Sequence, residues 1–422
     1  MTFESFAEAH TFILWAAFGI AFIMGAVVNK TNFCTMGAVS DLVNIQDSGR
    51  MRAWFLAVVV AMIGVIVVES MGLMSADAAR PPYRGSNFAW FEYLLGGIMF
   101  GIGMTYGSGC GNKTLIRIGG GNLKSLIVFA VIALCAYWMI NPFPGTDKTI
   151  YSVIFYPWTN PMTVSMAGQQ DVGSLVSRTI GLGDAVSMRM WIGGVVAIVL
   201  LAIIFKSKEF RSSFDNVLAG IVVGLAVLAA WYLSGAMATI NADGDLLSWV
   251  DYASDDNWSM LQEDPRPRGV FAQSFTFINP IGETLGYAKE GFSSIYLTFG
   301  VMAVFGVILG SLVWSLISKG FRIEWFVDAK DLMNHVIGAI LMGIGGVLAL
   351  GCTIGQAVTG ASTLSLGSFI AFAGIVFGSA LTMKMQYYKL LYEEEATFMK
   401  SFLSAMVDMR MLPSGLRKLE YM

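Results

Sequence analysis

The sequence predicts an all-α polytopic membrane protein with about nine transmembrane helices, plus re-entrant short helices, in an inverted repeat. Of the 422 residues, 56% are hydrophobic and only 13% are charged, whereas a soluble domain carries about 25% charged residues. Apolar runs recur at lengths near the ~20 residues that a helix needs to cross a bilayer. A glycine-rich pattern also occurs twice, and each copy ends at a cysteine. These three observations define the fold class.

Hydropathy along the chain indicates nine spans. The run at 11–29 follows Glu4 and Glu8 instead of a basic leader, so we expect a retained span and not a signal peptide. Glu69 is near the end of the second span, where a position at the membrane interface is expected. The expected spans are 11–29, 52–74, 90–107, 122–141, 189–206, 216–235, 295–318, 332–350 and 364–384.

Four glycine-rich segments between these spans are too short to cross the membrane. Irregular backbone at membrane depth is tolerated where protein or a cavity surrounds it, so we interpret these segments as re-entrant. They are 30–42, 108–120, 272–286 and 351–363. They follow the first and third spans of each half, and the single fifth span makes the second half inverted relative to the first. The predicted organisation is a first repeat at 1–141, an outer loop and connecting span at 142–215, a second repeat at 216–389 with an outer loop at 236–294, and an amphipathic cytoplasmic tail at 390–422.

The clearest internal repeat relates the stretch that ends at Cys110 to the stretch that ends at Cys352. Cys34 fits a weaker third copy, and a fourth copy has Thr276 in place of the cysteine. Glycine alone favours close helix packing in lipid, but a cysteine at the same register in both copies favours a pore-lining role. At a constant offset of 242 positions, the matching residues of the first copy are Gly96, Ile98, Gly101, Ile102, Gly103, Gly109 and Cys110.

Basic residues predict the orientation of the chain. In the nine-span arrangement, 18 of the 26 Lys and Arg residues fall on one side of the membrane and 8 on the other. The richer side is expected to be cytoplasmic, which puts the N-terminus outside and the C-terminus inside. The segments of Cys34 and Cys110 then enter from the cytoplasm, and the segment of Cys352 enters from outside.

The predicted site consists of thiols beside helix starts. A helix that begins after a glycine break has free amide groups and a partial positive charge, which suits an anion. We expect Cys135, in the middle of an ordinary span, to be a buried structural thiol. With no CxxC pair, two histidines and a net charge of −3, we expect no metal, cofactor or nucleic acid. The candidate path residues are Cys34, Cys110, Cys352, Asn32, Asn112, Lys113, Thr353 and Gln356.

The cysteine motifs resemble those of the YeeE/YedE family, the sulphur-transport domain of bacterial inner-membrane thiosulfate transporters. They read Asn-Phe-Cys-Thr-Met-Gly at 32–37, Gly-Ser-Gly-Cys-Gly-Asn at 107–112 and Gly-Cys-Thr-Ile-Gly-Gln at 351–356. The resemblance implies a nine-span inverted repeat with an hourglass path and three functional cysteines, which correspond to Cys34, Cys110 and Cys352. It also implies a multi-pass protein of the bacterial inner membrane, with membrane lipid and a cytoplasmic sulphur-carrier protein as partners. The outer loops here are longer than in compact members.

The expected function is uptake of thiosulfate, with no enzyme activity. Helix amides and Asn or Gln side chains can bind the oxygens of the dianion, and a protonated thiol is a weak donor that can face its soft sulphur. Transport of another sulphur or selenium species is the alternative. A membrane thiol oxidoreductase is a further alternative, although it would need cysteines paired at exchange distance. A channel for a small neutral or weakly acidic solute is the last.

Overall fold

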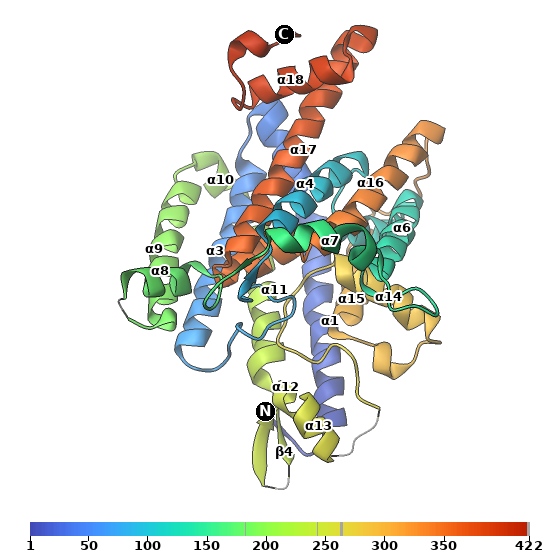
Figure 1. Ribbon diagram of the computed structural model, residues 1–422. Coiled ribbons are helices and arrows are strands. Elements are labelled where there is room, and N and C mark those ends of the chain that lie inside the picture. Colours follow the sequence, from blue (N-terminus) through green and yellow to red (C-terminus); the bar gives the residue numbers. More distant parts are fainter. Residues whose placement is uncertain (182, 243, 262–264, 420–422) are drawn as a thin grey trace.

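The computed structural model describes residues 1–181, 183–242, 244–261 and 265–419, and they form an almost entirely helical protein (Figure 1). Within these described residues, eight candidate membrane spans are long and apolar enough to cross a bilayer. This confirms the prediction of an all-α polytopic membrane protein. The principal helices of these spans are α1 (Phe6–Thr31), α3 (Gly49–Ser70), α6 (Leu123–Ile140), α9 (Ala185–Phe205), α11 (Phe214–Tyr232), α15 (Phe299–Ile317), α16 (Ala329–Leu348) and α17 (Leu366–Tyr392).

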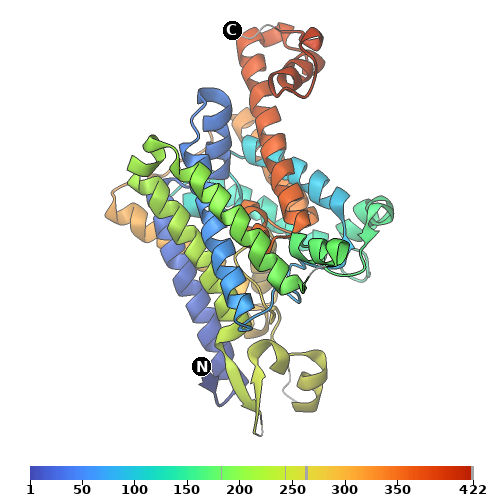
Figure 2. The same ribbon diagram turned by 90° about the vertical axis from the view of Figure 1, so that its left-hand side faces the viewer.

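The predicted span at 90–107 corresponds to α4 (Trp90–Tyr106), which has 17 residues and is not among the eight candidate spans of the described residues. At 1.5 Å per residue it is about 25 Å long. Helices α16 and α17 pack against it. The N-terminus and the C-terminus lie at opposite ends of the molecule in both views (Figures 1 and 2). An odd number of crossings gives this arrangement, but the ninth span stays a prediction.

The contacts between helices come in pairs. In each pair, one contact becomes the other when the helices of the first half are replaced by the corresponding helices of the second half, and the reverse. Helix α1 packs on α15 while α11 packs on α3, and α4 packs on α17 while α16 packs on α6. The exchange maps α1, α3, α4 and α6, in chain order, onto α11, α15, α16 and α17. Helices α4 and α16 also pack on each other. These contacts are the ones expected if the two halves are related by a two-fold axis between α4 and α16.

Glycines bring the backbones of α4 and α16 close together. A Cβ atom on Gly345 would lie 2.7 Å from the Gly96 carbonyl oxygen, and one on Gly103 would lie 2.7 Å from the Gly338 carbonyl oxygen. At the offset of 242 positions, Gly96 corresponds to Gly338 and Gly103 to Gly345, so the two contacts are images of each other. These repeated glycines therefore serve close helix packing, and the cysteines lie beyond the ends of the two helices.

Short helices occupy the predicted re-entrant segments. Three segments have the expected bounds to within a few residues. In the segment predicted at 272–286, the first six residues are not helical. Its helix begins at Ile278, so Phe277 and not Thr276 occupies the position before the helix. The short elements are α2 (Thr35–Ser40) with the π-helical turn η1 (Asp41–Ile45), α5 (Gly111–Gly119), α14 (Ile278–Lys289), and the turns η6 (Ile354–Gly360) and η7 (Ala361–Thr363).

The two long loops at 142–188 and 236–294 contain short helices and strands, and the C-terminal tail folds back on α17. Strand β4 lies between β1 and β5, at the same end of the molecule as the N-terminus (Figure 1), whereas α18 packs on α17 at the opposite end. The strands are β1 (Thr2–Phe3), β2 (Asn87–Phe88), β3 (Val164–Ser165), β4 (Thr239–Ala242) and β5 (Asp245–Ser248). The remaining helices and turns are η2 (Tyr151–Phe155), α7 (Tyr156–Thr159), η3 (Asn160–Met162), α8 (Val172–Ile180), α10 (Lys208–Ser212), η4 (Leu233–Met237), α12 (Trp249–Tyr252), α13 (Asp255–Leu261), η5 (Ser294–Tyr296), η8 (Glu393–Glu395), α18 (Phe398–Asp408) and η9 (Ser414–Leu416).

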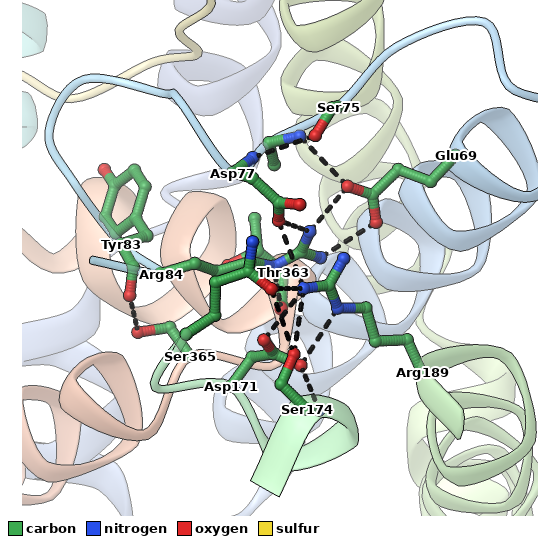
Figure 3. A network of polar contacts seen from close by, with 12 residues as sticks. Glu69, Ser75, Asp77, Tyr83, Arg84, Asp171, Ser174, Arg189, Thr363 and Ser365 are labelled. Carbon is green, nitrogen blue, oxygen red and sulfur yellow. Dashed lines mark hydrogen bonds and ion pairs between the residues drawn. The ribbon is translucent and has the colours of Figure 1, made fainter. Parts of the chain in front are cut away.

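A buried cluster of charges ties the loop at 142–188 to helices α3 and α9 (Figure 3). Arg84 donates to both carboxylate oxygens of Glu69 at 2.6 and 2.8 Å, and to Asp77 at 3.0 Å. Arg189 of α9 lies 2.9 Å from Asp171 and 3.1 Å from Asp77. Buried charges are tolerated when they are paired in this way. The Glu69 side chain lies at the end of α3, where it is buried and ion-paired, and its expected position at the membrane interface stays a prediction.

Candidate functional site

The same backbone turn precedes three of the four cysteines. Asn32, Ser108 and Leu350 have φ angles of 51°, 56° and 57°, which is the left-handed region that few residues other than glycine adopt. The amide that follows each of them donates to a carbonyl five residues earlier, and this closes the preceding helix. The residue after this amide is Cys34, Cys110 or Cys352, so the three cysteines share one kind of turn.

Each of these cysteines also begins the next helical segment. The backbone carbonyls of Cys34, Cys110 and Cys352 accept hydrogen bonds from the amides four residues later, at 2.9, 2.9 and 2.8 Å. A residue in this position stands beside the free amide groups of the first helical turn. The carbonyl of Phe277 accepts the corresponding bond from Ile281 at 3.0 Å, so α14 is a fourth helix start that lacks a thiol.

Three of the helix starts converge. A Cβ atom on Gly111 would lie 2.9 Å from Cδ1 of Ile278, and one on Gly346 would lie 2.7 Å from Cγ1 of the same side chain. Ile278, the first residue of α14, is therefore packed between the start of α5 and the end of α16. Cys352 faces the amide of Phe277, and Cys110 lies within electrostatic range of both Cys34 and Cys352. The structure thus brings the three predicted thiols to one interior region.

Buried polar atoms without a hydrogen-bond partner among the described residues gather at the same place. They include the hydroxyl oxygens of Thr35, Thr276 and Thr353 and the amide oxygens of Asn112 and Gln356. The Thr353 hydroxyl lies against the Cys110 thiol, and the Thr276 hydroxyl lies against the Cys352 thiol, but neither contact meets normal hydrogen-bond geometry. An unpaired buried polar group costs about 1–3 kcal/mol. These groups are available to a polar ligand.

The predicted site residues differ in how deeply they are buried. Cys352, Thr353 and Gln356 have no exposed surface, and the amide nitrogen of Gln356 donates to the Ala349 carbonyl. Cys110 is 2% exposed and Cys34 is 7% exposed. Within the described part of the chain, no group of three or more His, Cys, Asp or Glu side chains could hold a metal ion.

Basic side chains surround the turn that contains Cys34. The ammonium nitrogen of Lys113 lies 3.4 Å from the amide oxygen of Asn32, so this lysine reaches from α5 across to the other cysteine turn. Arg50 and Arg117 are close enough to interact electrostatically with Lys113. Arg50 is also paired with Asp41, at 2.5 Å. The part of the site around the Cys34 turn, which we call its basic mouth, can therefore attract an anion.

Cys135 lies apart from the site. A Cβ atom on Gly343 of α16 would lie 2.7 Å from Cβ of Cys135, so this cysteine packs in the contact between α6 and α16.

The sequence analysis did not single out Thr35 and Asn279, whose side-chain oxygens are buried without a partner among the described residues. The signals were the Cys-Thr pair at 34–35, which recurs at 352–353, and the Asn that is the second residue of both α5 and α14.

The fold and the site define a multi-pass membrane protein whose interior presents three thiols at helix starts. The chain belongs to the sulphur transport family, whose model matches residues 30–381, and this confirms the family resemblance of the cysteine motifs. The thiosulfate transporter TsuA of Escherichia coli (strain K12) is 21% identical over 377 residues, which cover 84% of this chain and 90% of that protein. The thiosulfate transporter TsuA of Spirochaeta thermophila is 22% identical over 380 residues, which cover 87% and 97%.

Proposed function

We propose that this protein takes up thiosulfate across the bacterial inner membrane through an interior path lined by Cys352, Cys110 and Cys34. The observation that carries the proposal is the convergence of helix starts with thiols and unpartnered polar atoms in one buried region. Both similar proteins described above are named thiosulfate transporters, which supports the choice of substrate.

The chemistry of the path suits a dianion with hard oxygens and one soft sulphur. The amides of the helix starts and the Thr353 and Thr276 hydroxyls can donate to the oxygens, and the protonated thiols can face the sulphur as weak donors. A thiolate would repel the ion. Weak binding at successive positions allows the ion to enter and to leave. Asn112 and Gln356 add amide groups beside Cys110 and Cys352.

The direction of the path follows from the two-fold arrangement and the charge distribution. We propose that residues 1–141 and 216–389 are inverted repeats, as the exchange of helix contacts supports. The N-terminus then lies outside and the tail at 390–422 lies in the cytoplasm. In this orientation Cys352 meets the substrate first, Cys110 lies near the middle, and Cys34 delivers it to the basic inner mouth formed with Lys113 and Asn32. A cytoplasmic sulphur-carrier protein is the partner that the family resemblance implies.

Uptake of radiolabelled thiosulfate into proteoliposomes tests the proposal. We expect Cys110→Ala and Cys352→Ala to abolish uptake and Cys135→Ala to leave it intact, because Cys135 packs between α6 and α16. Normal uptake in both of the first two variants would overturn the thiol path. Unlabelled sulphur and selenium oxyanions added as competitors identify the substrate, and one that blocks uptake at a lower concentration than thiosulfate would reassign it.

A further inference from the structure

Residues at the start of α4 and in the loop at 142–188 line a second polar cavity, whose walls include none of the three thiols. Its volume is about 450 Å³. Asn87 of β2 pairs with Ser165 of β3 in an antiparallel ladder, which fixes one part of the lining, and the turns η2 and η3 supply another. The side chains that matter to the argument are Asn87, Glu92, Tyr151, Asn160, Thr163 and Ser165.

Glu92 is the one charged side chain in the lining of this cavity, and it is only 8% exposed. Its Oε1 atom accepts hydrogen bonds from the hydroxyls of Tyr151 and Thr159, at 2.9 and 2.5 Å. Among the described residues, no Lys, Arg or His lies within ion-pair distance of Glu92, and its Oε2 atom accepts no hydrogen bond. Because buried charges in proteins are paired or coordinate a metal, this carboxylate lacks a counter-ion.

The other polar groups of the lining are neutral and rich in oxygen. Within the described part of the chain, the Asn160 side chain and the Thr163 hydroxyl make no hydrogen bond, so their oxygens are available to a ligand. Burial and the Glu92 carboxylate raise the pKa of Tyr151, so its hydroxyl keeps its proton and remains a donor to Oε1.

Oxygen ligands of this kind suit hard cations. A single carboxylate contributes one negative charge, which a monovalent cation balances and a divalent cation exceeds. The residues of the lining come from four separate segments of the chain, which is why the sequence gives no sign of a site.

We propose that this cavity binds one small monovalent cation, such as Na⁺, with Glu92 as its charged ligand. The bound cation joins the start of α4 to the loop at 142–188, because its ligands come from both. The site is separate from the thiols, and the proposal does not depend on which solute the protein transports.

Binding of radioactive sodium ions to the purified protein in detergent tests the site, with choline chloride keeping the ionic strength constant. We expect the wild type to bind sodium and Glu92→Gln to lose this binding, because the substitution keeps the shape of the side chain and removes its charge. Glu8→Gln is the matched control and should bind as the wild type does. Glu8 is exposed and, like Glu92, is the third residue of its helix, so its loss has the same effect on a helix start without changing the cavity.

The thermal stability of the same proteins gives a second measurement. A ligand that binds only the folded state stabilises it, so sodium at about ten times its Kd should raise the Tm of the wild type and of Glu8→Gln by about 2 °C. The Tm of Glu92→Gln should not respond. Thr163→Val keeps the carboxylate and removes one neutral oxygen, and it should raise the Kd for sodium about tenfold. This variant decides the test if Glu92→Gln does not fold.

Three results would overturn the site. They are no sodium binding in the wild type, equal binding in the wild type and Glu92→Gln, and an unchanged Kd in Thr163→Val. Displacement of sodium by a lower concentration of calcium chloride would overturn the choice of a monovalent cation. None of these results bears on thiosulfate uptake, so the site and the proposed function can fail independently.

Discussion

Replacement of Arg84 by Met tests the energetic role of the buried charge cluster. The Arg84 side chain has no exposed surface and donates to Glu69, to Asp77 and to the Thr363 carbonyl. After the replacement, Asp77 keeps its contact with Arg189 at 3.1 Å. Among the described residues, Glu69 keeps only the hydrogen bond from the Ala76 amide, at 3.0 Å. Because one buried carboxylate loses its cation, we expect the free energy of unfolding to fall by about 3–5 kcal/mol.

Unfolding of the detergent-solubilised protein in a titration with SDS, followed by tryptophan fluorescence, measures this loss. The control is Arg50→Met, which breaks a similar pair with Asp41, but the Arg50 side chain is 38% exposed. Solvent-screened pairs contribute about 0–1 kcal/mol. Glu69→Gln in the Arg84→Met background should restore part of the stability, since it removes the unpaired charge. Equal losses in Arg84→Met and Arg50→Met would refute the reasoning.

Two further predictions concern the helix pair and the outer loop. Gly103→Ala and Gly345→Ala each place a Cβ atom 2.7 Å from a carbonyl oxygen of the facing helix. Each should lower stability by about 1–3 kcal/mol, by similar amounts because the contacts are images, and a loss in only one variant would contradict the two-fold relation. Burial favours the neutral form of Asp171, but hydrogen bonds from Arg189 and Ser174 hold its pKa below the usual range. Its stabilising effect is therefore present above about pH 3.9 and is lost as the pH falls through the lowered pKa. The difference in Tm between wild type and Asp171→Asn should narrow below that pH, and a constant difference down to pH 3 would count against this cause.

The sequence predicts the parts of the fold that depend on local pattern and on duplication. Hydropathy identifies the spans, and the constant offset between Cys110 and Cys352 identifies two equivalent helices whose contacts prove reciprocal. Cysteines next to glycine indicate that a helix ends and another starts. These signals are readable because each is contained within a few consecutive residues or repeats along the chain.

Long-range features have no such signal. Glu69, Arg84 and Arg189 belong to three separate segments, and only the folded chain brings them together. For the same reason the sequence did not indicate that Glu69 is ion-paired with Arg84. The lining of a cavity beside α14 combines Arg268 from a long loop with Lys289 from the end of that helix, and neither residue stands in a motif. The exact start of α14 likewise depends on packing around Ile278.

The position of a bound substrate analogue tests the thiol path most directly. Selenosulfate replaces the soft sulphur of thiosulfate with selenium, whose anomalous scattering locates that atom in crystals of the protein. We predict a selenium peak in contact with the thiols of Cys110 and Cys352, with the oxygens toward the helix starts. A selenium peak in another part of the protein, with the region between these two cysteines empty, would contradict the account.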